Sequence, residues 1–146
     1  MEIVKKLVFI LTCTISLMAS DIVIKESKHS VSKTVENIKN IVTKKGFSVF
    51  NVIDHKANAA SVGMNMKNAK VIIFGNPKVG TKLMKDNILS ALDLPMKVLV
   101  YKDSDKKVKL AYRDGSWLKK THSLNNNKLS SKIDGALNKI TDKAIR

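Results

Sequence analysis

The chain has 146 residues, enough for one domain, and 44% of them are hydrophobic, which is ordinary for a globular protein. Its 27 basic and 12 acidic residues give a net charge of +15, which favours anionic partners such as nucleic acid, acidic lipid or small anions. The lysines are spread over every segment, with only Arg113 and Arg146 besides. Because a nucleic-acid interface gathers its basic residues on one face, we interpret the charge as a solvated basic surface and predict no nucleic-acid partner.

Residues 1–20 have the order of a secretory signal peptide. Two lysines precede an apolar run over 7–19, and small residues come just before Asp21. The run is shorter than the roughly 20 residues that cross a bilayer. We therefore predict cleavage near Ser20, a periplasmic or secreted protein that is not transmembrane after cleavage, and one domain over 21–146. The alternatives are an uncleaved anchor or a buried N-terminal helix.

Cys13 raises the further alternative of a lipoprotein. The three residues before it faintly resemble a lipoprotein cleavage box, although Thr12 is bulkier than the small residue usual there. Cleavage near Ser20 instead leaves a mature chain without cysteine. Disulfides, thiolate catalysis and cysteine metal sites are then excluded together.

The hydrophobic pattern predicts alternating strands and helices. The predicted strands are 21–25, 47–53, 71–74, 96–101 and 108–112, and the predicted helices are 31–42, 55–62, 81–92 and 129–140. Ser30 or Ser32 is expected to cap the first helix, and Gly46 and Gly63 are expected to end the first two. The last two strands flank a short turn and predict a hairpin. Residues 119–128 are expected to form a loop.

This order predicts a single α+β domain with a mixed sheet packed by helices. A purely parallel sheet is excluded by the hairpin. No internal repeat and no linker long enough to divide the mature chain is present.

The segment IIFGNPKVGTKLM, residues 72–84, resembles a phosphate-binding P-loop in its glycine spacing. Thr81 and Lys82 stand in swapped order, so each side chain is turned about 100° from the position where a P-loop needs it. Pro77 also removes one backbone amide from the cradle. We therefore exclude a nucleoside triphosphatase.

A structural turn is the favoured interpretation of the same segment. Asn76 and Pro77 are typical of a turn start, and Gly75 and Gly80 are expected to take backbone angles closed to other residues. Thr81 is expected to cap the helix that follows. The alternative is an anion or small-ligand site, in which free amides at the helix start act with Lys78 and Lys82.

Asp54 and His55 follow a predicted strand and suggest two roles. We favour one of them as the cap of the next helix. The alternative is an acid/base pair, or half of a site with Asn76, from which one side chain reaches the glycine segment. Met64 and Met66 with His55 raise the alternative of a Cu(I) site. We favour methionines that replace core leucines. The other histidines, His29 and His122, are expected to be solvated.

Several strings resemble the domain of unknown function 302 family. The strings are FGNP-x-x-GT-x-LM (74–84), LDLP (92–95) and VLV (98–100), with Gly46-Phe47, Ile53-Asp54-His55, Ala59-Ala60 and Gly63 upstream and Tyr112 and Leu118 downstream. The resemblance runs from about residue 32 to 122. It implies a TATA-binding-protein-like β-α-β4-α fold that is often a homodimer, and the family has no established reaction. The chain departs from the pattern at Met64 and Met66, where leucines are usual.

We interpret the chain as a non-enzymatic exported domain that binds a small ligand, with an anion favoured by the charge, or a partner protein. No cofactor or metal is predicted. The alternative is an enzyme of unknown class that uses His55 or Asp54 as acid/base. The predicted ligand-binding residues are Asp54, His55, Asn76, Lys78, Gly80, Thr81 and Lys82.

Overall fold

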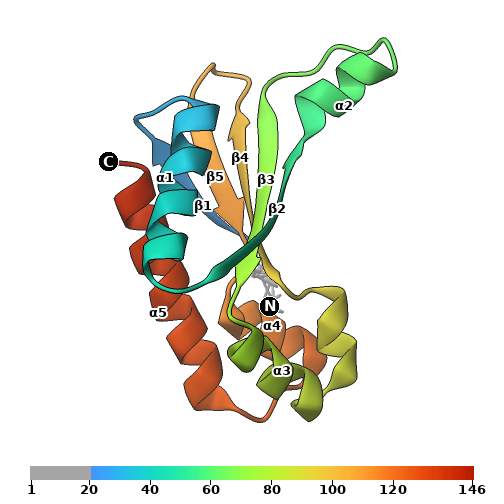
Figure 1. The fold of residues 1–146 in the computed structure, drawn as a ribbon, viewed down its shortest axis with the longest axis vertical. Helices are drawn as coiled ribbons and strands as arrows, with labels where there is room; N and C mark the ends of the chain where they lie inside the picture. The colour runs from blue at the N-terminus through green and yellow to red at the C-terminus, as the bar shows by residue number, and fades with distance from the viewer. Residues whose placement is uncertain (1–20) are drawn as a thin grey trace, which may run out of the picture.

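The computed structural model describes residues 21–146; the predicted signal peptide and Cys13 lie outside them. The elements are β1 (Val23–Ser27), α1 (Val31–Lys44), β2 (Ser48–Asp54), α2 (His55–Ser61), β3 (Ala69–Gly75), α3 (Pro77–Asp86), the 3-10 helix η1 (Ile88–Leu92), β4 (Met96–Lys102), β5 (Val108–Tyr112), α4 (Gly115–His122) and α5 (Asn127–Ala144). Figure 1 confirms the predicted α+β class, with β1, α1, four further strands and α5 as its frame. Within 21–146, no helix is both long and apolar enough to cross a membrane.

The five strands form one sheet in the order β1-β5-β4-β3-β2, and all four pairings are antiparallel. The prediction of a mixed sheet is therefore wrong, because the sheet is entirely antiparallel. Helix α1 joins β1 to β2, two strands that run in the same direction, but they occupy opposite edges of the sheet. The other three strands lie between them, so the crossover creates no parallel neighbours. The predicted hairpin of β4 and β5 is confirmed.

Helices α1 and α5 cover one face of the sheet. The Ser30 hydroxyl caps α1 by accepting the Lys33 amide at 3.2 Å, as predicted. Gly46 takes a left-handed φ of 75° just after the helix, which a side chain would disfavour. The side chains between these helices and the sheet form the main core: Val31, Val35, Ile38, Val42, Ile72, Phe74, Val98, Val100, Leu110, Tyr112, Leu137, Ile140 and Ala144.

The helix predicted over 81–92 is broken at Asn87. This residue has extended angles (φ −146°, ψ 116°), so α3 ends before it and η1 begins after it. Its side chain donates to the His122 carbonyl oxygen at 2.8 Å and accepts the Leu89 amide at 3.0 Å. Because the chain changes direction here, Ile88 faces solvent instead of continuing the apolar side of α3.

The loop predicted over 119–128 is also wrong in part, because α4 covers its first residues. Asp114 caps α4 by accepting the Trp117 amide at 2.8 Å, and Ser123 ends it in a left-handed conformation. The helix has only eight residues and two large apolar side chains, which is too few for a visible helical period.

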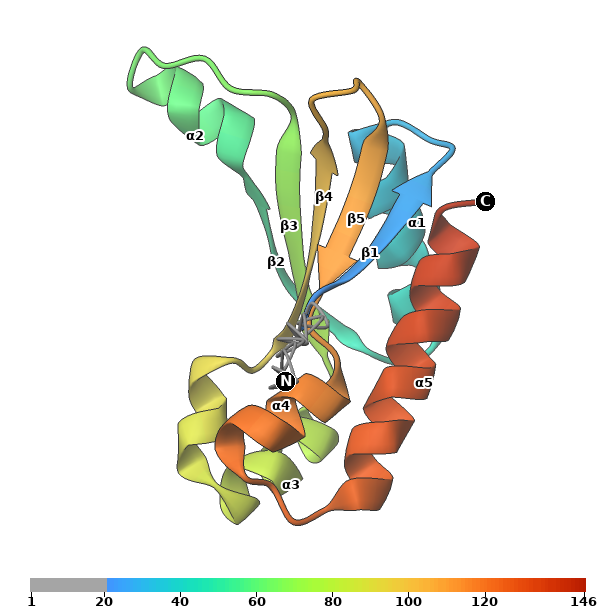
Figure 2. The same ribbon diagram turned by 180° about the vertical axis from the view of Figure 1, so that it is seen from behind.

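A second, smaller core lies between α3, α4 and the start of α5, at one end of the sheet. Leu83, Leu118 and Leu124 are its buried members, and Met96 and Ile133 contact both cores. In Figure 2 these helices form a lobe below the strands, on the side opposite to α2. The two cores are therefore separate sets of buried residues that lie next to each other.

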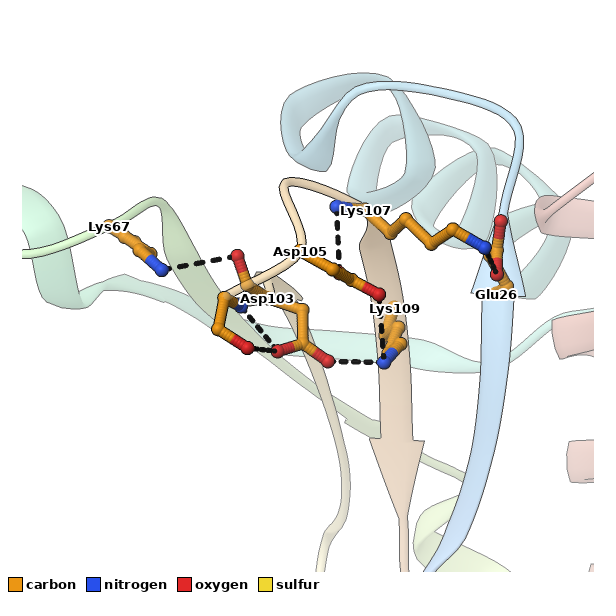
Figure 3. A network of polar contacts seen from close by, with 7 residues as sticks. Glu26, Lys67, Asp103, Asp105, Lys107 and Lys109 are labelled. Carbon is orange, nitrogen blue, oxygen red and sulfur yellow. Dashed lines mark hydrogen bonds and ion pairs between the residues drawn. The ribbon is translucent and has the colours of Figure 1, made fainter.

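An ion-pair network closes the β4–β5 hairpin (Figure 3). Asp103 pairs with Lys109 and accepts bonds from the amide and hydroxyl of Ser104, while Lys107 pairs with Glu26 at 2.9 Å. The Lys109 hydrogen bond, followed by that of the Ser104 amide, lowers the pKa of Asp103 to about 2.

We expect this network to stabilise the fold less at low pH. Because the pKa of Asp103 is lower in the folded protein, its contribution is complete above the ordinary value of 3.8 and is lost as pH falls through about 2. Lys109→Met should return the Asp103 pKa toward 3.8, measured by carbon NMR of the carboxyl group. Lys107→Met is the control, because the Lys107 ammonium pairs with Glu26. An equal shift of the Asp103 pKa in both variants would show that Lys109 is not its specific cause.

Candidate functional site

An apolar cavity of about 320 Å³ lies where the two cores meet. Phe74, Leu137 and Ile140 of the main core face it from one side, and Leu83 and Leu94 of the second core from the other. The complete lining is Phe47, Phe50, Phe74, Gly75, Asn76, Pro77, Val79, Gly80, Thr81, Leu83, Met84, Leu94, Pro95, Met96, Ile133, Ala136, Leu137 and Ile140. Only two of these side chains, Asn76 and Thr81, are polar, and none is ionisable.

The glycine segment forms one wall of this cavity. Strand β3 ends at Gly75, and Asn76 caps α3 by accepting the Lys78 amide at 3.0 Å. Pro77 takes the first helical position, where its missing N–H costs nothing. Every residue from Phe74 to Met84 except Lys78 and Lys82 lines the cavity. The segment is therefore the start of a helix with one side on the cavity.

Two predicted features of this segment are wrong. Asn76, rather than Thr81, caps the helix, so Thr81 lies inside α3. Neither Gly75 nor Gly80 has a positive φ. Gly75 is the last residue of β3, and Gly80 is an ordinary helical residue of α3. A Cβ on Gly80 would lie 4.0 Å from the Met84 methyl carbon, so the glycine leaves space beside the cavity.

The alternative of an anion site built from free backbone amides is not supported at this helix start. The Lys78 amide is bonded to the Asn76 side chain, and the amides of Val79 and Gly80 donate to the Asn76 carbonyl oxygen at 3.0 and 2.9 Å. Lys78 and Lys82 are exposed and lie four residues apart on the side of α3 that faces away from the cavity. Neither lysine lines it.

Asp54 and His55 lie at the far end of the β2–β3 hairpin. Because these strands are antiparallel, Asp54 pairs with Lys70 while Ser48 pairs with Gly75, which places Asp54 roughly 20 Å from the glycine segment. The prediction of one pocket shared by the two sites is therefore wrong. Both sites follow a strand, but successive antiparallel strands finish at opposite ends of a sheet.

Asp54 acts as the cap of α2. Its carboxylate accepts the Ala57 amide at 3.0 Å and pairs with the Lys70 ammonium at 3.1 Å. The Ala57 hydrogen bond, with that of Lys70, lowers the pKa of Asp54. A carboxylate with a lowered pKa is a weak general base near neutral pH, so the local structure favours capping over acid/base chemistry.

Two further predictions are wrong, those for the methionines and for His122, as the exposure of these side chains shows. Met64 and Met66 are 65% and 43% exposed on the connection from α2 to β3, so they do not replace core leucines. His122 is only 8% exposed and its Nε2 lies 2.7 Å from an Asp93 carboxylate oxygen, so it is not solvated. His29 is half-buried, with its Nε2 2.8 Å from the Arg146 carbonyl oxygen.

Sequence reasoning missed most of the cavity wall. Phe50, Pro95, Ala136 and Ile140 come from four segments far apart in the chain and carry no polar group that marks a site. One signal was present: the family-like strings FGNP-x-x-GT-x-LM and LDLP both reach this cavity. Their shared location could be found only from the structure.

Comparison with known proteins identifies the family of this chain. The model for "Domain of unknown function DUF302" matches residues 23–140. The chain belongs to the DUF302 family. A crystal structure of an uncharacterized conserved DUF302 protein from Bacillus stearothermophilus is similar to it, with a TM-score of 0.78 and 17% identity over 88% of this chain and 100% of that one. At this identity the likeness shows the DUF302 fold.

The chain is also similar to part of longer proteins. It is 40% identical over 109 residues to fluoride-specific ion channel FluC 1 of Brucella suis and to FluC 1 of Brucella abortus. The aligned region covers 75% of this chain but only 43% and 40% of those two proteins. The DUF302 chain thus spans less than half the length of the curated relatives it matches.

Proposed function

We propose that this DUF302 protein is a non-enzymatic binding domain that holds an apolar small molecule in the cavity between its two cores. The observation that carries the proposal is the location of FGNP-x-x-GT-x-LM, whose residues supply one wall of the cavity. The volume of about 320 Å³ lies within the range of small-molecule pockets.

The lining indicates the chemistry of the ligand. Aromatic and aliphatic side chains recognise shape and apolar surface, and an ionic group here would lose its hydration without gaining a charged partner. The Asn76 side chain is already bonded to the Lys78 amide, which leaves Thr81 as the polar group at the exposed side of the cavity. An acyl chain or an aromatic ring system with at most one polar end fits this arrangement.

A fluorescent apolar probe tests this function directly. We expect N-phenyl-1-naphthylamine to bind saturably and with increased fluorescence. Ala136→Met should weaken binding at least about tenfold, because the longer side chain occupies the cavity that Ala136 lines. Ala60→Met is the matched control, since Ala60 is exposed on α2 at the far end of the molecule. Equal binding by both variants would contradict the proposal.

A second candidate function is the binding of a small anion on the outer side of α3. The net charge of +15 and the likeness to part of two fluoride-specific channels favour it. Lys78, Lys82 and Lys85 are exposed on this side. Fluoride, phosphate and sulfate should each raise the melting temperature if they bind the folded state. Lys78→Ala with Lys82→Ala should remove that increase, and an unchanged increase would exclude these lysines.

We further propose that the protein is exported, as the order of residues 1–20 indicates. Intact-mass measurement of the protein recovered from the periplasm should give a chain that begins near Asp21. A mass that retains Met1, or a lipid attached to Cys13, would contradict this proposal.

We also propose a homodimer through the sheet face that α1 and α5 leave open. Strand register places Ile24, Ala111, Leu99, Val71 and Ile53 in one row across all five strands. Each is half-buried or exposed, so a second copy would cover apolar surface. Light scattering at micromolar concentration should give twice the monomer mass, and Leu99→Lys should reduce it; a monomer mass for the unaltered protein would refute the dimer.

A further inference from the structure

The 3-10 helix η1 presents three large aliphatic side chains to solvent. Ile88 is 70% exposed, Leu89 60% and Leu92 79%. They occupy a single five-residue helix, in which Ser90 is the buried residue. Isolated exposed aliphatic residues are common, but three on one short helix form an apolar knob, which we define as Ile88, Leu89 and Leu92.

The exposure of the apolar knob is fixed by the surrounding structure. The side chain of Asn87 holds the start of η1 to the carbonyl oxygen of His122. At the other end, the carboxylate of Asp93 lies 2.7 Å from His122 Nε2. Both ends of η1 are thus attached to α4, which directs the three side chains outward. Figure 2 shows η1 in yellow at the end of the molecule opposite to α2.

The chain segments that build this lobe are rich in basic residues. Residues 77–97 and 114–134 contain eight lysines and four aspartates, a net charge of +4. Asp114 and Asp134 accept hydrogen bonds from the backbone amides of Trp117 and Gly115. Asp86 is bonded to Asn125, and Asp93 to His122. None of these lysines makes an ion pair within residues 21–146: Lys78, Lys82, Lys85, Lys97, Lys119, Lys120, Lys128 and Lys132.

We propose that this lobe binds the surface of an anionic membrane, with the apolar knob inserted among the lipids and the lysines against their headgroups. Peripheral membrane attachment combines these two features: apolar side chains reach the boundary between headgroups and acyl chains, and lysines are attracted to acidic lipid. Lysines without acidic partners match a lipid surface better than the same lobe of a second copy, whose own lysines would repel them.

Vesicle sedimentation tests the proposal on the protein as purified from cells. We expect binding to vesicles that contain phosphatidylglycerol, little binding to pure phosphatidylcholine, and loss of binding as salt is raised. Replacing Ile88, Leu89 and Leu92 together by serine should weaken binding at least about tenfold, because the inserted apolar surface is removed. Because all three are exposed, the far-ultraviolet circular dichroism should stay unchanged.

Two matched variants separate this lobe from general basicity. Val62→Ser with Met64→Ser removes aliphatic side chains that are 71% and 65% exposed at the opposite end, and should leave binding unchanged. Lys78→Glu with Lys82→Glu should weaken it several-fold, whereas Lys39→Glu with Lys44→Glu on α1 should have a smaller effect. Absence of binding to phosphatidylglycerol, or equal loss in knob and control variants, would overturn the proposal. A knob-dependent dimer without vesicle binding would reassign the knob to protein contact.

Discussion

Phe74→Ala should lower the free energy of unfolding by about 3–5 kcal/mol, one of the largest effects expected in this protein. Phe74 is 2% exposed, belongs to the main core, and meets Phe47 edge to face with ring centroids 6.4 Å apart. The substitution removes buried aromatic surface and joins a new void to the existing cavity. Urea denaturation followed by circular dichroism measures the change.

Phe50→Ala is the matched control for that experiment. Phe50 lines the same cavity but is 53% exposed, at the bulge where β2 slips against β3. Its loss should change stability by about 0.5 kcal/mol or less, while binding of the apolar probe should weaken. If both variants lost the same stability, Phe50 would be part of the core and the cavity would be less open than described.

Gly115→Ala should destabilise the protein by about 3 kcal/mol, because the added Cβ has no space. It would overlap the Ser130 carbonyl oxygen and lie 2.9 Å from the Ile133 Cβ. The Gly115 amide also donates to the Asp134 carboxylate at 2.5 Å, so this close contact joins α4 to α5. Separation of the two helices would disturb the second core. Thermal unfolding should show a clear fall in the melting temperature.

Gly135→Ala makes the same chemical change without the steric conflict. Gly135 lies within α5, and nothing is found within 4 Å of its Cβ position. Alanine there should stabilise the protein by about 0.5–1 kcal/mol, since it restricts the unfolded chain more than glycine does. A loss of stability in this variant equal to that of Gly115→Ala would show that helix glycines matter here for a reason other than space.

Much of the fold could be predicted from local patterns. The spacing of Val31, Val35, Ile38 and Val42 predicted α1, and alternating or apolar runs predicted the strands within a few residues. The pattern failed where a single polar residue controlled the backbone. Asn87 interrupts an otherwise continuous helical pattern through its bond to His122, 35 residues away. Such a tertiary contact leaves no local signal.

The site was harder to predict because its chemistry is apolar. Polar residues after strands drew attention to Asp54 and His55, yet both lie at the end of the sheet remote from the cavity. Asn76, Gly80 and Thr81 do line the cavity. Asn76 starts the turn into α3 as expected, whereas Thr81 does not cap the helix and Gly80 has no positive φ. The walls formed by Ala136 and Ile140 depend on how two cores meet, which is a property of packing rather than of any one segment.

The most direct test of the binding function is an NMR titration of the isotope-labelled protein with decan-1-ol, an alkyl chain with one uncharged polar end. We predict saturable chemical-shift changes at Gly75, Gly80, Met84 and Ile133, which line the cavity, and none at Asp54 or His55. In the Ala136→Met variant the same changes should require a much higher concentration. Shifts confined to surface lysines, or an absence of saturable shifts at the four cavity residues, would contradict the account.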